Sequence, residues 1–277
     1  MAAGCRVVRA TELTFREPAA IVHQLLQSRS AAIVVALVAI ACGSGSSSPT
    51  QSITSTTGAT SSTSTNSTTT LPPGYEKFTN GTSVRISGNN VIVSTADIPN
   101  HKSPYFGVGN ANYIAPQAGM VPNPSNIGAQ TYVLTIPIAP AIAANASDTP
   151  LDAIGVALNG VVFFNQYAAG RVALGPEIVS FDQYNGHPAM RNNYHYHWEP
   201  LFLTQSSKSV LIGFMLDGFP IYGPQETTGM APTGLDSCNG HTHATLEYPN
   251  GIYHYHVVSS PPYLVGCFRG TPGTVTN

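Results

Sequence analysis

The chain has 277 residues, of which 9% are charged, and its formal net charge at pH 7 is −2. It is long enough for one good-sized domain. A nucleic-acid partner would call for a basic patch, and this balance of charges argues against such a partner.

Residues 1–42 are predicted to be a signal segment. Four arginines precede the apolar run AAIVVALVAIAC, which is shorter than the about 20 apolar residues that a membrane-spanning helix needs. The run ends at Cys42, which Gly43 follows, and this ending resembles a bacterial lipobox. The resemblance implies cleavage before Cys42, a lipid on its sulfur, and an exported protein anchored to a membrane of the cell envelope, on its extracellular or periplasmic side. An ordinary cleaved signal with a chance cysteine is the alternative.

Residues 43–71 are predicted to be a disordered tether. Serine and threonine dominate from Ser44 to Thr70, and no residue in that stretch is charged. Such a composition cannot build a core. We therefore expect the folded domain to occupy residues 72–277.

Short apolar runs between Asn-Gly and Asp-Gly turns predict an all-β domain. SVRISGNNVIVS at 83–94 indicates two strands about a turn, and QTYVLTIPI at 130–138 indicates another strand. AIGVALNGVVFF at 153–164 predicts a hairpin whose first strand is buried on both faces. The 22 prolines and 26 glycines disfavour long helices. We expect a sandwich or a barrel-like domain with long loops.

Two segments share an order of motifs, which predicts an internal duplication. Residues 185–197 and 239–256 both begin with Asn-Gly-His and end with Tyr-His-Tyr-His. An apolar run that contains glycine follows each of them, at 210–218 and at 263–270. Two related halves would bring equivalent residues together about a pseudo-twofold axis.

The histidines of the two tetrads are candidate metal ligands. Alternate side chains of a strand point to one face, so the two histidines of a tetrad would share a face opposite its two tyrosines. Such a His-x-His pair can place two ring nitrogens on one ion. If the two tetrad strands meet, one site would gather His195, His197, His254 and His256, with His187 and His241 at matching positions of the repeat.

The ligand types suit a copper or zinc ion, and raw affinity favours copper. Tyr196 and Tyr255 are candidate neighbours of such a site, although we expect the tetrad tyrosines mostly to pack against the opposite sheet. Asp217 is a candidate acceptor for a ligand histidine's ring N–H, but an Asp-Gly turn alone explains it. Glu247 lies opposite His254 if Asn250-Gly251 form a two-residue turn, and one position out of that register if the turn includes Pro249. Both registers remain open.

Two cysteines fall in the predicted domain. In an oxidising compartment, a disulfide between Cys238 and Cys267 is the simplest prediction, with two thiolate metal ligands as the alternative. We also expect His101 to be exposed without partners, Trp198 to pack at the core or its rim, and Arg269 to pair with an acid beside the disulfide.

Several motifs together resemble the YHYH-domain proteins. They are the two tetrads, LDGFPIYGP at 216–224, LDSCNGH at 235–241 and GCFRG at 266–270. The resemblance covers about residues 150–272. It implies an exported bacterial domain but no substrate.

The sequence thus predicts an extracytoplasmic, membrane-tethered domain that binds a transition metal through paired His-x-His strands. One alternative is a metal-dependent oxidase or hydrolase that acts on envelope or extracellular polymers. The other is a structural or adhesive module without metal. The motifs of serine hydrolases, zinc proteases and nucleotide-binding proteins do not occur, and no protein or polysaccharide partner is indicated.

Overall fold

The structure is a computed structural model that describes residues 70–277. The predicted signal segment, the predicted lipid site at Cys42 and nearly all of the predicted tether lie outside the described residues. Within residues 70–277, no helix is both long and apolar enough to cross a bilayer.

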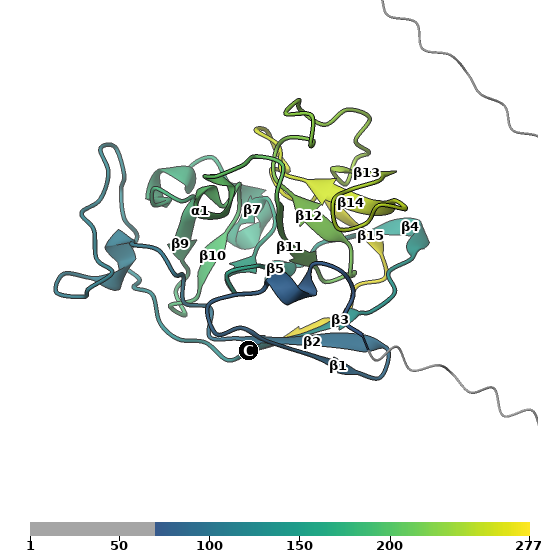
Figure 1. The fold of residues 1–277 in the computed structure, drawn as a ribbon. Helices are drawn as coiled ribbons and strands as arrows, with labels where there is room; N and C mark the ends of the chain where they lie inside the picture. Colours follow the sequence, from purple (N-terminus) through teal and green to yellow (C-terminus); the bar gives the residue numbers. More distant parts are fainter. Residues whose placement is uncertain (1–69) are drawn as a thin grey trace, which may run out of the picture. The chain divides into compact units, whose positions relative to one another are not determined.

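Strands are the main regular structure of the described residues, as the all-β prediction requires, and within them no sheet closes into a barrel (Figure 1). The larger sheet has eight strands, in the spatial order β13 (Gly240–His243), β14 (Ile252–His256), β12 (Pro220–Tyr222), β11 (Leu211–Met215), β5 (Gly155–Ala157), β6 (Val162–Phe163), β10 (Tyr194–Tyr196) and β9 (Gly186–Pro188). The four-stranded sheet has the order β1 (Ser83–Ser87), β2 (Asn90–Thr95), β3 (Tyr132–Pro137) and β16 (Thr274–Thr276).

The remaining elements are short. Two small two-stranded sheets pair β15 (Cys267–Gly270) with β4 (Ile142–Asp148) and β7 (Tyr167–Ala168) with β8 (Val172–Ala173). The helical elements are α1 (Leu201–Thr204) and the 3₁₀ turns η1 (Tyr75–Lys77), η2 (Pro104–Phe106), η3 (Ala169–Arg171) and η4 (Ile178–Ser180).

The predicted hairpins form where the turn residues indicated them. β1 pairs with β2, and β5 pairs with β6 about the Asn159-Gly160 turn. All three residues of β5 are buried, as predicted for a strand covered on both faces. A Cβ on Gly155 would lie 2.6 Å from the carbonyl oxygen of Phe214, so this position has room for glycine alone.

The internal duplication is confirmed, and it extends further than the tetrads. β5 and β11 pair antiparallel at the centre of the sheet, and the strands continue outward in matching order, β6-β10-β9 on one side and β12-β14-β13 on the other. IGVALNGVVFF at 154–164 therefore corresponds to IGFMLDGFPIY at 212–222. The prediction that 210–218 corresponds to 263–270 is wrong, because residues 267–270 form β15 in a separate small sheet.

The hydrophobic core joins the two main sheets. Leu134 and Ile136 of β3 are fully buried in the same cluster as Val156 of β5 and Phe214 of β11. Tyr75 of η1 stacks on the Phe214 ring with 3.8 Å between centroids. Each such side chain contributes about 1.5–3 kcal/mol when buried, and this packing holds the central strands that position the outer ones.

Candidate metal centres

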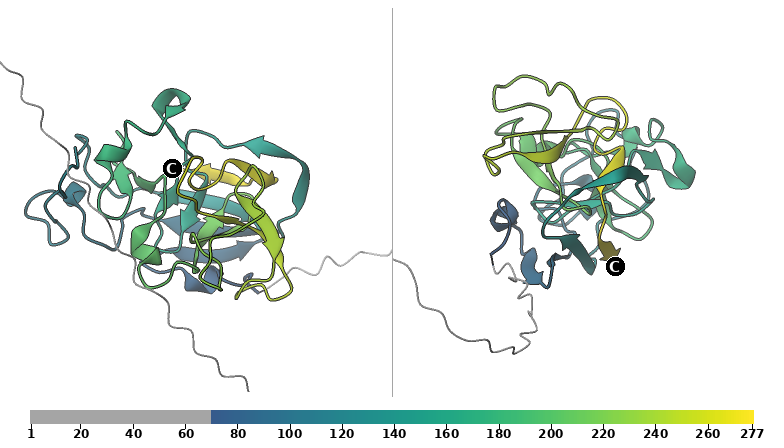
Figure 2. Two further views of the ribbon diagram at one scale, coloured as in Figure 1. Left: turned by 90° about the horizontal axis from the view of Figure 1, so that it is seen from above. Right: turned by 90° about the vertical axis from the view of Figure 1, so that its right-hand side faces the viewer.

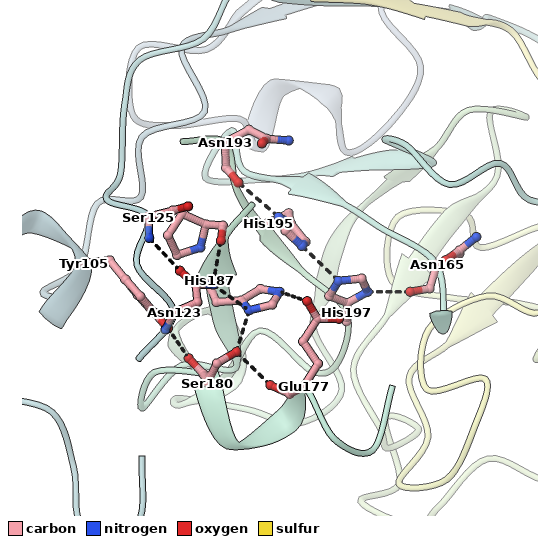
Figure 3. Close-up of polar contacts among 11 residues, drawn as sticks. Tyr105, Asn123, Ser125, Asn165, Glu177, Ser180, His187, Asn193, His195 and His197 are labelled. Carbon is pink, nitrogen blue, oxygen red and sulfur yellow. Dashed lines mark hydrogen bonds and ion pairs between the residues drawn. The ribbon is translucent and has the colours of Figure 1, made fainter. Parts of the chain in front are cut away.

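Three histidines lie close together in the first half of the duplicated sheet, which comprises β5, β6, β10 and β9 (Figure 3). His187 of β9 lies directly opposite His195 of β10, and His197 follows two residues later on the same face. Their candidate ligand atoms all lie within 4.8 Å of one another, and all three residues are buried. We call this group the first histidine cluster.

Backbone carbonyls fix the orientation of two of these rings. His195 Nδ1 lies 3.0 Å from the carbonyl oxygen of Asn193, and His197 Nδ1 lies 2.5 Å from that of Asn165. Because a carbonyl only accepts hydrogen bonds, each Nδ1 carries the hydrogen and each Nε2 of the neutral ring carries a lone pair. The two Nε2 atoms are 2.9 Å apart, so two acceptors face each other.

That separation fits two ligands of one ion. Nitrogens bound to a metal at about 2.0–2.1 Å lie about 2.9 Å apart at a right angle and about 3.3 Å apart in a tetrahedron. His187 completes the set, since its Nε2 is buried and has no hydrogen-bond partner among the described residues. Its Nδ1 lies 2.7 Å from the hydroxyl of Ser180, which itself donates to the carbonyl of Glu177 and so accepts from the ring.

A carboxylate lies beside the first histidine cluster. Glu177 Oε1 is 3.8 Å from His187 Nε2, and its other oxygen is buried without a hydrogen-bond partner in the described part of the chain. Burial raises the pKa of Glu177. A bound cation would reverse that effect and supply the missing partner.

The histidines of this cluster are neutral at pH 7. Burial, reinforced by the neighbouring His197, lowers the pKa of His187 to about 3. Burial also lowers the pKa of His197 to about 4 and that of His195 well below its ordinary value. The three rings are therefore neutral imidazoles with free nitrogen lone pairs, which is the form of histidine that binds a metal.

Four histidines form a second cluster in the other half of the sheet. Their ligand atoms also lie within 4.8 Å of one another. His241 of β13 lies opposite His254 of β14, as His187 lies opposite His195 in the first half. The second histidine cluster comprises His241, His243, His254 and His256.

The backbone holds these rings in the same way. His254 Nδ1 lies 2.9 Å from the carbonyl oxygen of Ile252, and His256 Nδ1 lies 2.8 Å from that of Gly223. Gly223 corresponds to Asn165 in the duplicated alignment of the two halves, so the same carbonyl orients the last histidine of each tetrad. Burial is the main reason that the pKa of His254 is lowered to about 4, and the neighbouring histidines lower it further.

Glu226 approaches the second cluster from the segment between β12 and β13. Its Oε1 lies 3.2 Å from the Nε2 atoms of His241 and His243 and 3.4 Å from that of His256. Only the contact with His243 has the geometry of a hydrogen bond, so the buried Nε2 atoms of the other three histidines have no such partner within residues 70–277. Burial opposes the ionisation of Glu226, but the histidines, His256 first, bring its pKa below the ordinary value.

The prediction that the four tetrad imidazoles meet in one pocket is wrong. β10 and β14 are separated by β6, β5, β11 and β12 in the sheet. Figure 1 shows β9 and β10 at one end of the sheet and β13 and β14 at the other, and the left view of Figure 2 shows the same separation. The six predicted ligands are instead divided between two clusters, three in each.

The second cluster also contains a ligand candidate that the sequence analysis left out. His243 lies two residues from His241 on one strand, which is the alternation used for the tetrads. Both hairpin registers considered for Asn250-Gly251 are wrong. His243 pairs with Ile252, and residues 244–251 form a longer loop.

The two carboxylates that were predicted to lie beside the metal ligands make hydrogen bonds with groups other than the ligand histidines. Asp217 accepts from the hydroxyl of Tyr255 at 2.5 Å and from the backbone N–H of Gly270 at 2.9 Å. Glu247 accepts from the hydroxyl of Tyr222 at 2.8 Å and pairs with the ammonium of Lys77.

The second tyrosine of the first tetrad occupies the position that corresponds to Tyr255. Tyr196 lies 3.2 Å from the side-chain amide of Asn159, which corresponds to Asp217. The tyrosines of both tetrads are buried in the core cluster, on the strand faces opposite the histidines, as predicted.

Two aspartates that sequence reasoning missed support the tetrads. The hydroxyl of Tyr194 donates to Asp182 at 2.8 Å, and that of Tyr253 contacts Asp236 at 3.1 Å. Each aspartate begins the motif Asp-x-x-Asn-Gly-His and also accepts backbone N–H groups of its own turn. The signal was present in the sequence, since the aspartate stands three residues before Asn-Gly-His in both copies.

Four further predictions can be compared with the structure. The disulfide between Cys238 and Cys267 forms. Arg269 pairs with Asp236 at 3.3 Å, and Trp198 packs 5.1 Å from the Tyr263 ring, as expected. The exposed position predicted for His101 is wrong: the residue is buried, and its Nε2 lies 3.0 Å from the Tyr196 hydroxyl, because the loop that carries it folds onto the tyrosine face of β10.

Comparisons with known proteins agree with the architecture of the site. The family model described as YHYH protein matches residues 133–234 and 225–270, which include both histidine clusters. Searches of the curated proteins and of the solved structures found no match. The chain belongs to the family of YHYH proteins.

Proposed function

We propose that this protein binds two transition-metal ions outside the cytoplasm, one in each histidine cluster. The observation that carries the proposal is the repeated set of hydrogen bonds between ring Nδ1 atoms and backbone carbonyls. In both halves these bonds orient the two buried histidines of the tetrad, and the buried Nε2 atom of a third histidine and a glutamate lie beside them. Leaving such lone pairs buried without partners is costly, and a cation would satisfy them.

Copper is the ion that we favour, with zinc as the alternative. Both clusters offer imidazole and carboxylate donors, and the two cysteines of the domain are joined to each other. In the absence of thiolate, the affinity of such donors for divalent ions is highest for copper. Handling or sensing of the ion requires only this binding.

Export and membrane attachment complete the proposal. The disulfide supports an oxidising compartment, and the sequence before residue 43 supports a signal with a lipid at Cys42. Mass spectrometry of the protein from a membrane fraction would test the anchor. A mature N-terminus at Cys42 that carries diacylglycerol is expected, and an unmodified N-terminus elsewhere would refute it.

Elemental analysis of the purified protein tests metal binding. We expect two equivalents of metal in the wild type, one in His195→Ala, one in His254→Ala and none in the double variant, since each change removes a central ligand of one cluster. His101→Asn is the matched control, because His101 is a buried histidine outside both clusters, and this variant should keep both ions. Equal metal content in the wild type and the double variant would refute the proposal and leave a structural module.

A further inference from the structure

We propose that the two clusters have diverged, and that the second one is a ligand-binding metal centre. Its ligand would be a small carboxylate or phenolate whose apolar body is about the size of a substituted benzene ring. The anionic oxygen would coordinate the ion, and the body would fill the adjoining cavity. This inference rests on the proposed metal binding and adds the class of ligand.

A cavity adjoins the second cluster. Its volume is about 370 Å³, and His243, His254, His256 and Glu226 form part of its wall. The cavity beside the first cluster has a volume of about 200 Å³. A cavity of about 150 Å³ suffices for benzene, so the larger one holds a substituted ring while the smaller has little room beyond the ring itself.

The larger cavity arises from a longer hairpin. The pairs Pro188–Tyr194 and Thr242–Tyr253 are equivalent in the two halves. Beyond the first pair the chain turns back within residues 189–193, whereas beyond the second it adds the pair His243–Ile252 and then the loop 244–251. Four consecutive residues of this loop, Ala244 to Glu247, line the cavity.

Two substitutions between the halves also favour a ligand at the second cluster. Phe164 stacks on His195 with 4.0 Å between ring centroids and so covers that imidazole. The corresponding Tyr222 meets His254 edge-on at 5.2 Å and lines the cavity, with its hydroxyl bonded to Thr245. The position of His243 is occupied in the first half by alanine, so the second cluster has an additional imidazole that is 40% exposed.

The charges around the cavity select the chemistry of the ligand. Histidine binds a metal as the neutral imidazole, so a divalent ion held together with the Glu226 carboxylate would have a net charge of about +1. Lys77 and Glu247 pair with each other and leave that charge uncompensated. Val210, Leu211 and Leu246 supply an apolar wall. A singly charged oxygen donor on an apolar body would match both features, because it neutralises the ion and buries its carbon skeleton.

Titration of the copper-loaded full-length protein with 4-nitrocatechol tests the inference, because the visible absorption of this phenolate changes when it coordinates a metal. We expect saturable binding to the wild type that benzoate displaces. His195→Ala should lose one ion and bind the probe with unchanged affinity. His254→Ala should lose the other ion and weaken probe binding at least tenfold. Probe binding that is lost in His195→Ala and kept in His254→Ala would overturn the inference.

Cavity variants separate the ligand from the metal. Replacement of residues 244–251 by Asn-Gly would close the hairpin directly after the His243–Ile252 pair and remove one cavity wall. Ser209 also lines the cavity but lies outside the hairpin, so Ser209→Trp would fill the cavity without changing the hairpin. Each should retain two ions and bind the probe at least tenfold more weakly. Two bound ions with unchanged probe binding in both variants would refute this inference alone, whereas a wild type without metal would refute the proposed function itself.

Discussion

Tyr255→Phe and Tyr196→Phe form a matched pair of substitutions at equivalent positions of the two halves. Tyr255 donates to the buried carboxylate of Asp217 at 2.5 Å and accepts from the backbone N–H of Arg269 at 2.8 Å. The hydroxyl of Tyr196 has neutral partners, the side-chain amide of Asn159 at 3.2 Å and the ring of His101 at 3.0 Å. We expect Tyr255→Phe to destabilise the fold more than Tyr196→Phe.

The magnitudes follow from these partners. Loss of a hydrogen bond to a charged group costs about 1.5–3 kcal/mol, and the N–H left without a partner adds about 1–3 kcal/mol, so Tyr255→Phe should cost about 2.5–6 kcal/mol. Two neutral hydrogen bonds at about 0.5–1.5 kcal/mol each give about 1–3 kcal/mol for Tyr196→Phe. Neither variant should change the metal content, since both hydroxyls lie on the faces opposite the histidines.

Urea unfolding of the metal-free protein, with a check that the slope is unchanged, measures both free energies. Tyr222→Phe is a useful control, because it removes a hydroxyl that is bonded at the cavity wall and not in the core. The reasoning would be refuted if the two variants lost equal free energies of unfolding, or if Tyr196→Phe lost more. Either result would show that the difference between Asn159 and Asp217 does not determine the strength of these hydrogen bonds.

Three further predictions concern stability. Burial holds the pKa of His187 at about 3 and that of His197 at about 4, so below pH of about 6.5 the unfolded chain binds protons that the folded chain excludes. The urea midpoint of the metal-free protein should therefore fall steadily between about pH 6.5 and pH 4, and a constant midpoint would contradict the burial of these rings. Gly186→Ala would place a Cβ 2.2 Å from the Tyr194 hydroxyl, so calorimetry should show a loss of about 1–3 kcal/mol or more, whereas Gly175→Ala, at an exposed turn where φ is not positive and no atom lies within 4 Å of the new Cβ, should lose less. Reduction of the disulfide, which closes a separation of 29 residues, should cost about 3–4 kcal/mol and lower Tm, and an unchanged Tm in reductant would exclude a stabilising role for it.

Local patterns in the sequence predicted local structure well. The alternation of tyrosine and histidine placed the imidazoles of each tetrad on one face, and Asn-Gly turns located the hairpin of β5 and β6. The duplication was also visible, although the similarity of 154–164 to 212–222 was missed because only Ile154, Gly155, Leu158 and Gly160 recur unchanged in the second copy.

The sequence could not show how far apart the duplicated sites lie. A pseudo-twofold axis brings together only residues near the axis, and the axis passes between β5 and β11 while the tetrads lie on outer strands. Strand order in a sheet depends on long-range pairing, which no local pattern encodes. The same limit applies to His101, whose burial depends on Tyr196, far along the chain. The register of the hairpin before β14 was predicted wrongly because the chain turns back over residues 244–251 and not at Asn250-Gly251 alone.

The seam between β5 and β11 suggests how the protein originated. Gly155 and Gly213 are equivalent, and each lacks room for a side chain because a Cβ would lie 2.6 Å or 2.2 Å from a carbonyl oxygen of the facing strand. Two identical half-length chains would meet the same requirement with a single glycine and would form a symmetric dimer. Gene fusion of such an ancestor would join its two subunits, after which each copy could evolve independently.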